Sequence, residues 1–362
     1  MIEPVSPEAL RAEPDTALVP APSVSGFTHL HAGHCESGVT TAMFREGGLQ
    51  LTEPLVFGVG SGLFFAHFSF VRVMGHPLTT FRSFPGAIFK AACKRLGVSA
   101  RRETFRDPAR GMARLDAVLA EGRRVGLQVN IYWLPYIPKA MRVHFNGHNL
   151  IVLEKRGDTY IVSDPVMECL FECPADALRR ARFSGGNPLL PKGLMYWPTA
   201  VPTDVALGSA VQAGLGEVCH RMLHIPGVLP WMGVQGVGHL GRQIPTWPDR
   251  LGEGRAREWL AGVVRMQEEI GTGGAGFRFL FAAFLEQAGA RLGWSALGAL
   301  APEATAVGDL WRGFALEASR VARRRSALSF ADIGAMLGPI EVAERALYER
   351  LDAVRRAPQI TG

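Results

Sequence analysis

A cysteine lies directly before a predicted helix in the stretch HLHAGHCESGVTTAMFREGG, residues 29–48. The pattern after it predicts a helix over residues 36–44, which ends before a pair of glycines. A thiol at the start of a helix lies beside unpaired amide groups and the positive end of the helix dipole, and both favour the thiolate. Cys35 is therefore a candidate nucleophile, and the alternative is a small buried thiol without a catalytic role.

A metal site is the other alternative for this stretch, with His29, His31 and His34 beside Cys35. Four ligands so close in sequence at the start of a helix cannot easily converge tetrahedrally on one ion. The second cysteine pair of the chain, Cys169 and Cys173, lacks the two-residue gap of a zinc ribbon. We therefore expect neither a metal nor a cofactor.

A nucleophilic cysteine needs an imidazole as base and a carboxylate or amide that orients the imidazole. Residues 148–155 and 158–164 are rich in β-branched and apolar residues, and they predict two strands of a hairpin. A three-residue loop over residues 155–157 would set His148 opposite Asp164 on one face of the sheet. The pair would then supply the base and the orienting group.

The elements that must position these residues predict an α+β domain followed by a helical one. Residues 1–24 predict a flexible arm, and residues 25–184 combine predicted helices, notably 107–124, with short strands. A segment punctuated by proline, residues 185–204, predicts a linker. Residues 205–362 predict a mostly helical domain, with strong helical patterns at 255–271, 277–293, 304–325 and 339–356.

The composition is typical of a globular chain with a moderate excess of basic over acidic residues. The 362 residues include 48% hydrophobic ones, and 39 lysines and arginines exceed 33 aspartates and glutamates by six. This excess is spread along the chain without a zinc-finger spacing or an aromatic basic stripe, so we do not expect nucleic-acid binding.

The N-terminus has no apolar signal, and the five cysteines are an odd number, which favours a cytoplasmic protein with reduced thiols. The apolar window 55–71 is too short and glycine-rich to span a membrane, and predicts buried core or a pocket wall.

Three stretches carry a resemblance to a known family: GHCESGVTTAMFREGGLQLTEPLVFGVGSGLFF, LPYIPKAMRVHFNGHNLIVLEKRGDTYIVSDP and GTGGAGFRFLFAAFLEQAG. Together they resemble the butirosin biosynthesis protein H family of antibiotic biosynthesis. The resemblance implies a papain-like domain followed by a helical domain. It also implies transfer of an acyl group from an acyl carrier protein thioester to an amine, with Cys35 as nucleophile, His148 as base and Asp164 as orienting acid. His144 is the alternative base, but only His148 begins the apolar strand.

The substrate-binding residues are less clearly marked. The glycine-rich GVGSG stretch predicts either a pocket wall near Cys35, as the family implies, or a tight crossing of two chain segments. The stretch NIYWLPYIP predicts either the lining of an acyl channel or a core strand with a proline turn. The candidate substrate-binding residues are Gly58, Gly60, Ser61, Gly62, Asn130 and Tyr132.

The second donor for an oxyanion is not evident, because papain-like peptidases place a glutamine a few residues before the cysteine and this chain has HLHAGH there. The candidates are His29, His31, Gln128 and Asn130.

Three functions remain open at this point. The first is acyl transfer from a phosphopantetheinyl carrier protein through an acyl-Cys35 intermediate to a small-molecule amine. The second is a cysteine hydrolase that acts as a peptidase, amidase or thioesterase, and the third is a non-catalytic module that binds a carrier protein. The arginine runs 179–182 and 322–325 suit an acidic carrier surface, although most such runs are solvated helix faces. The exposed face of the helical half could serve a partner or a second copy of the chain.

Overall fold

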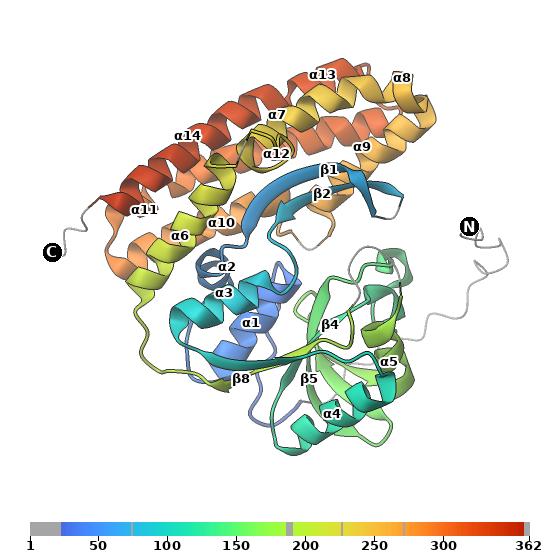
Figure 1. The fold of residues 1–362 in the computed structure, drawn as a ribbon, viewed down its shortest axis with the longest axis vertical. Coiled ribbons are helices and arrows are strands. Elements are labelled where there is room, and N and C mark those ends of the chain that lie inside the picture. The colour runs from blue at the N-terminus through green and yellow to red at the C-terminus, as the bar shows by residue number, and fades with distance from the viewer. Residues whose placement is uncertain (1–22, 74, 186–190, 226, 271, 358–362) are drawn as a thin grey trace.

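A computed structural model describes residues 23–357 except 74, 186–190, 226 and 271. It is an α+β structure, as predicted, in which an antiparallel sheet lies below a layer of helices (Figure 1). The predicted arm, residues 1–24, lies outside the described residues except for its last two. No helix in the described ranges is long and apolar enough to cross a membrane.

The sheet has six strands and antiparallel pairing between every two neighbours. Apolar side chains alternate along the central strand β5, so that Leu150 and Val152 face one core while Ile151 and Leu153 face another. In spatial order the strands are β3 (Ser99–Glu103), β8 (Met195–Ala200), β4 (Val125–Val129), β5 (His148–Arg156), β6 (Thr159–Ser163) and β7 (Leu170–Pro174).

Helices cover both faces of this sheet. The helix α1 (Cys35–Glu46) packs on one face, and α4 (Pro108–Ala120) and α5 (Ala175–Phe183) pack on the other. The α1 helix begins one residue earlier than predicted, so Cys35 is its first residue, and it ends before Gly47. Its side chains are buried from Cys35 to Phe44 because the sheet and the helical layer enclose it.

The hairpin between β5 and β6 differs from the prediction. Arg156 pairs with Thr159, which leaves a two-residue turn in which Gly157 adopts a φ of +58°. An irregularity between Val152 and Glu154 then shifts the register again. The predicted three-residue loop was therefore wrong, and Asp164 follows the end of β6 instead of pairing with His148 in the ladder.

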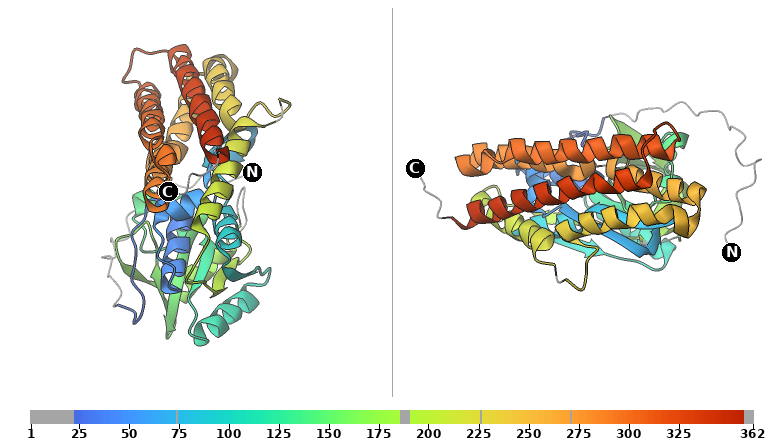
Figure 2. Two further views of the ribbon diagram at one scale, coloured as in Figure 1. Left: turned by 90° about the vertical axis from the view of Figure 1, so that its left-hand side faces the viewer. Right: turned by 90° about the horizontal axis from the view of Figure 1, so that it is seen from above.

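A second hairpin forms a separate two-stranded sheet that packs on the helical layer. Its strands β1 (Leu63–Val73) and β2 (His76–Arg82) pack against α7 (Gly233–Gln243) and α9 (Glu253–Glu268), and one hydrophobic core extends from α1 into the helices. Figure 2 shows the helices side by side in this layer. The remaining helices are α2 (Glu53–Val59), α3 (Ala87–Leu96), α6 (Leu207–Leu223), α8 (Trp247–Leu251), α10 (Arg278–Leu292), α11 (Ser295–Gly298), α12 (Ala301–Ala322), α13 (Phe330–Ala335) and α14 (Leu337–Arg356).

The described part of the predicted linker contributes to the sheet. Its strand β8 lies between β3 and β4, where Trp197 and Tyr196 are buried. Proline at position 198 is compatible with this place because it follows the two residues of β8 that pair with β4. The sequence pattern failed here because prolines on both sides obscured a short strand.

Candidate active site

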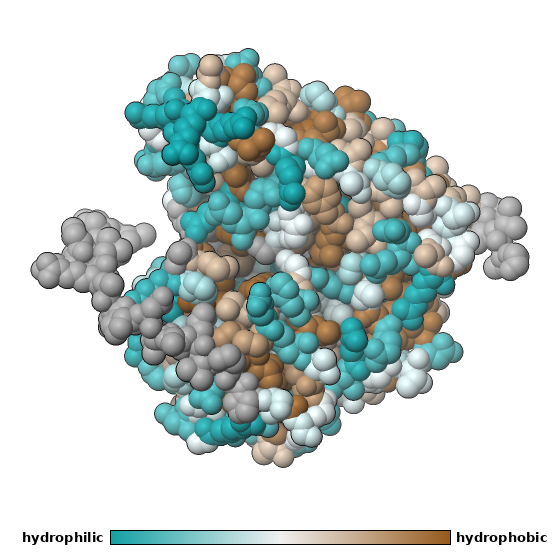
Figure 3. Space-filling view, turned by 180° about the vertical axis from the view of Figure 1, so that it is seen from behind, coloured by the Kyte–Doolittle hydropathy of each residue, from teal (hydrophilic) through white to brown (hydrophobic). Residues whose placement is uncertain are grey.

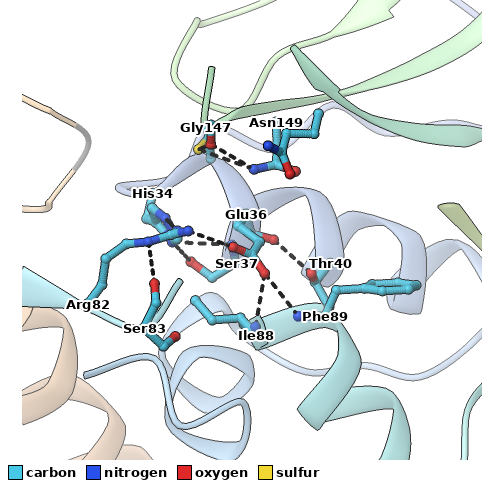
Figure 4. Close-up of polar contacts among 12 residues, drawn as sticks. His34, Glu36, Ser37, Thr40, Arg82, Ser83, Ile88, Phe89, Gly147 and Asn149 are labelled. Carbon is cyan, nitrogen blue, oxygen red and sulfur yellow. Dashed lines mark hydrogen bonds and ion pairs between the residues drawn. The ribbon is translucent and has the colours of Figure 1, made fainter. Parts of the chain in front are cut away.

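Cys35 lies at the amino end of α1 and is 7% exposed. As the first residue of the helix it has an amide without an intrahelical acceptor, and its side chain lies close to the strand β5. Its sulfur is 4.0 Å from the carbonyl oxygen of Gly147 and 3.9 Å from Nδ2 of Asn149. Gly147 and Asn149 lie next to each other in Figure 4. The thiol is thus held between a helix terminus and the start of a buried strand.

His148 and Asp164 meet beside this sulfur. His148 Nε2 is 2.7 Å from Asp164 Oδ2, and His148 lines the same cavity as Cys35 and is close enough to lower the pKa of its thiol. Asp164 is fully buried and accepts further hydrogen bonds from Tyr136 Oη at 3.0 Å and from the Val166 amide at 3.3 Å. These contacts fix the carboxylate, which in turn fixes the orientation of the imidazole.

The pKa values of the pair favour a thiolate and an imidazolium. Burial raises the pKa of the Cys35 thiol, but the nearby His148 and, to a smaller extent, the positive charge of Arg82 outweigh it and lower the pKa below its ordinary value. Burial likewise lowers the pKa of His148, but Asp164 and Cys35 raise it to about 10. Burial raises the pKa of Cys93, Cys173 and Cys219 to about 12, so Cys35 differs from these thiols.

A buried ion pair lies on the other side of Cys35. Arg82, from the end of β2, reaches Glu36 Oε2 at 2.8 Å, and Glu36 is fully buried. The second carboxylate oxygen of Glu36 accepts from the amides of Ile88 and Phe89 at 2.9 and 3.2 Å, in the first turn of α3 (Figure 4). Glu36 therefore joins α1 to both α3 and the β1–β2 hairpin, and its two sets of donors satisfy both oxygens.

His34 continues this network towards α2. Its Nε2 lies against the Arg82 guanidinium, and its Nδ1 accepts from the Ser37 amide at 3.3 Å, which caps the start of α1. Nδ1 is 2.9 Å from Ser37 Oγ, which donates to Glu53 Oε1 at 2.9 Å. Burial, with the charge of Arg82, lowers the pKa of His34 well below its ordinary value, which agrees with a neutral ring. Glu53 also accepts from the amides of Gly33 and His34, so it fixes the chain just before the cysteine.

The candidate site opens into a cavity of about 600 Å³ whose lining includes Cys35, His148 and Arg82. The opposite wall comes from the end of α9 and the segment after it, including Glu268, Ile270 and the glycines at 273 and 274. Figure 3 shows the molecular surface hollowed between the helical layer and the sheet domain. Both halves of the chain therefore build one site.

The structure does not bring the glycine-rich stretch to this cavity. Gly58 packs on the ring of Phe284, and Gly60 and Gly62 pack on Ile88 and Phe57. Ser61 is buried, has a φ of +50°, and donates to the carbonyl of Gly214 at 2.9 Å. This stretch is the tight chain crossing between α2 and β1, and none of its residues is among those lining the cavity of Cys35.

Asn130 and Tyr132 also lie away from the cavity lining. Asn130 is buried and bonds to Asn146 and to the Tyr132 amide, at 2.7 and 3.0 Å. The ring of Tyr132 stacks on His144, 3.9 Å between centroids, and neither residue is among those that line the cavity of Cys35, whereas His148 is. The neighbouring Ile131 and Phe145 line the cavity instead.

Among the candidate oxyanion donors, only His31 lines the cavity. The ring of His29 bonds to Ser163 Oγ and to the Met167 carbonyl, at 2.8 and 2.9 Å. Gln128 donates to the carbonyl of Asn146 at 2.9 Å. These side chains are already engaged in the sheet domain, so their hydrogen bonds stabilise the fold around the site.

Sequence reasoning missed Arg82, Glu36 and Glu53 as parts of the site. The neighbours of Cys35 in sequence, His34 and Glu36, were visible but carried no sign of their partners. Arg82 arrives through a hairpin that no alternating pattern marked, because β1 is almost continuously apolar at its start. Only the tertiary structure, which places the β1–β2 hairpin, shows that Arg82 lies next to the buried carboxylate of Glu36.

The fold and this geometry define a papain-like cysteine-enzyme domain: a cysteine at the start of a helix that packs on an antiparallel sheet, with a histidine and an aspartate from later strands. Residues 34–165 match the family model described as Butirosin biosynthesis protein H, N-terminal, and residues 176–351 match the one described as Domain of unknown function (DUF4872). Two successive segments of the chain therefore match the model of the N-terminal domain of butirosin biosynthesis protein H and the model of the domain of unknown function, in the order that the resemblance implied.

No curated protein sequence matches this chain. Among solved structures, the chain is similar to a crystal structure from Bacillus anthracis described as a C39-like peptidase, with 12% sequence identity and a TM-score of 0.32. The similarity covers 49% of this chain and 94% of that one.

Proposed function

We propose that the protein is an acyltransferase that carries an acyl group on Cys35 between a thioester donor and an amine acceptor. The observation that carries the proposal is that Cys35 and His148 lie together in the wall of one cavity of about 600 Å³, with His148 bonded to the buried Asp164. A carboxylate fixed by three donors holds the imidazole in place. The butirosin biosynthesis protein H family, whose N-terminal model matches residues 34–165, supports transfer as the type of reaction.

In the first step the Cys35 thiolate attacks the carbonyl carbon of the thioester. The Cys35 amide and the first turn of α1 stabilise the oxyanion, and the positive charge of Arg82 adds to this field. The carbon–sulfur bond to the donor then breaks, and the donor thiol leaves with the proton of the His148 imidazolium. The products are an acyl-Cys35 thioester, a neutral His148 and a free donor thiol.

In the second step an amine nitrogen attacks the acyl carbon. Neutral His148 takes a proton from the amine, and the bond between the acyl carbon and Cys35 breaks. The products are an amide and the original thiolate–imidazolium pair. The wall formed by α9 and the segment after it limits access to the acyl group, which favours the amine over water.

A carrier protein is the proposed donor because a basic cluster lies next to the cavity. Burial lowers the pKa of His76, Glu258 opposes this, and Arg265, Arg255 and Arg72 are close enough to lower it further; Arg265 also lines the cavity of Cys35. Carrier proteins are acidic and present their acyl group on a phosphopantetheine arm, so both the surface and the phosphate would be attracted. Arg255→Glu should raise KM for a carrier-bound thioester about tenfold and leave the KM of a free pantetheine thioester unchanged, while Arg320→Glu on α12 is the matched control.

Intact-mass measurement tests the acyl intermediate. The wild type should gain the mass of one acyl group from a pantetheine thioester, and Cys35→Ala should not. Cys93→Ala is the matched control, because Cys93 is buried and burial raises its pKa to about 12. An adduct that persists in Cys35→Ala, or no adduct on the wild type, would refute the proposal.

Product analysis separates transfer from hydrolysis. We expect amide product that increases with added amine, whereas free acid released at the same rate with and without amine would identify a hydrolase instead. An acyl adduct on Cys35 would also eliminate the non-catalytic carrier-binding alternative.

A further inference from the structure

A second cavity of about 300 Å³ adjoins the cavity of Cys35. The two share the lining residues Arg82, Phe145, Gly147 and Ile270, so one opens beside the other. Gly147 is also the residue whose carbonyl lies 4.0 Å from the Cys35 sulfur. A group bonded to that sulfur therefore has the second cavity within reach.

The walls of the second cavity are mainly apolar and come from both halves of the chain. The β1–β2 hairpin and the segment after it supply Phe68, Leu78 and Phe84, and the helical region supplies Met266, Ile270 and Phe277. Phe277 also packs edge-on against His34, with ring centroids 5.0 Å apart, which ties this wall to the start of α1. Apolar walls beside a nucleophile suit an apolar substrate group, because its burial removes apolar surface from water.

One polar atom in this lining has no partner. Ser83 is 4% exposed, and within the described ranges of the chain its hydroxyl forms no hydrogen bond. A buried hydroxyl without a partner is costly, and a ligand with one hydroxyl or carbonyl group would satisfy it. The Arg82 guanidinium is engaged with Glu36, His34 and the Ser83 carbonyl, so it is not free to neutralise a second carboxylate.

We propose that the second cavity binds the acyl group carried by Cys35, and that this group is apolar, aliphatic or aromatic, with a single neutral polar substituent near Ser83. This inference rests on the proposed acyl transfer and adds the substrate class to it. It also assigns a role to the domain of unknown function: Met266, Ile270 and Phe277 determine which acyl groups are accepted. A charged acyl group such as glutamyl is disfavoured, because an unpaired charge would enter an apolar cavity.

The test measures single-turnover acylation of Cys35 by mass, without acceptor, from acetyl, octanoyl and glutamyl thioesters of pantetheine. The octanoyl group should react at least about tenfold faster than either of the others, since each methylene that fits an apolar pocket adds to selectivity. Similar rates for all three thioesters would overturn this inference while leaving the acyltransferase proposal intact. No adduct from any thioester would instead refute the proposed function.

Two variants locate the selectivity. Leu78→Trp fills the cavity, and we expect it to lower the ratio of octanoyl to acetyl rates about tenfold, whereas Leu316→Trp changes an exposed leucine of α12 and should preserve the ratio. Ser83→Ala should abolish any preference for a hydroxyoctanoyl over an octanoyl group and keep the octanoyl to acetyl ratio. An unchanged ratio in a folded Leu78→Trp protein would place the acyl group elsewhere.

Discussion

Two buried ion pairs of similar geometry lie in different parts of this molecule. Arg82 meets Glu36 at 2.8 Å beside the candidate site, and Arg278 meets Glu344 at 2.6 Å inside the helical layer. Both glutamates are fully buried, whereas the Arg82 side chain is 13% exposed and the Arg278 side chain 1%. The difference is access, because Arg82 lines the cavity of Cys35 whereas Arg278 is not in the lining of either cavity.

The surroundings of the two pairs explain what each does. Glu344 also accepts from Trp311 Nε1 at 2.6 Å, and the Arg278 guanidinium lies over the rings of Trp311 and Phe81. This pair joins helices and the β1–β2 hairpin into one core. Arg82, in contrast, joins Glu36 and His34 while its charge lowers the pKa of Cys35, after the larger effects of burial and His148. A buried ion pair therefore indicates chemistry only where a cavity reaches it.

Removal of the base should give the largest change. His148→Ala should lower the rate of Cys35 acylation about 10³-fold, because both the proton acceptor and the charge that stabilises the thiolate are lost. Single-turnover acylation by mass measures this rate. His144→Ala is the matched control, since that ring stacks on Tyr132 and His144 does not line the cavity of Cys35; equal losses in the two variants would contradict the assignment of the base.

Disruption of the ion pair between Arg278 and Glu344 should lower the stability of the fold and leave the acylation rate nearly unchanged. Arg278→Met leaves Glu344 buried without its cation and should lower the free energy of unfolding by about 3–5 kcal/mol. Urea unfolding measures the loss, and the exposed Arg320→Met is the control. The rate of acylation per folded molecule should stay within a factor of about two. A large loss of the acylation rate in Arg278→Met would show that the Arg278–Glu344 pair, like the Arg82–Glu36 pair, is needed for chemistry.

The pH dependence of acylation should distinguish the two pairs directly. The rate should rise as pH increases through the lowered pKa of Cys35 and fall as pH increases through about 10, where His148 loses the proton it gives to the leaving thiol. Arg82→Met should move the acid limb to higher pH because a charge that lowers the thiol pKa is gone. Arg278→Met should leave this limb in place, and a shift equal to that of Arg82→Met would refute the distinction.

The smallest expected effect concerns the orientation of the aspartate. Tyr136→Phe removes one hydrogen bond to Asp164 and should lower the free energy of unfolding by about 1 kcal/mol. The acylation rate should fall only a few fold, because His148 and the Val166 amide still hold the carboxylate. Tyr348→Phe is the matched control, since the buried Tyr348 hydroxyl has no partner in the described part of the chain, and it should not lower stability.

Two features of the site were predicted from the sequence, but the structure supports the reasoning behind only one of them. The helix after Cys35 was predicted within one residue at its start, because capping and periodicity act over a few residues. The meeting of His148 with Asp164 was predicted, but through a hairpin register that the structure contradicts. The meeting occurs because Asp164 lies just past β6, at the same end of the sheet at which β5 begins.

For the glycine-rich stretch GVGSG, the sequence left two interpretations open. Its composition predicted either a pocket wall or a chain crossing, and only the neighbours decided between them: Phe284 packs on Gly58, and Ile88 and Phe57 pack on Gly60 and Gly62. Those partners come from three different helices, so no local pattern could have selected the crossing.

The sequence by itself determined the local elements: a helix next to a thiol, a strand that starts at a histidine, and a second half built from helices. These depend on interactions between residues close in the chain. Only the tertiary structure decided that Arg82 reaches Glu36, that the β1–β2 hairpin packs on the helical layer, and that Ile270 and Phe277 form a wall beside Cys35. Each of these contacts joins segments far apart in the chain, and their formation depends on how the whole core packs.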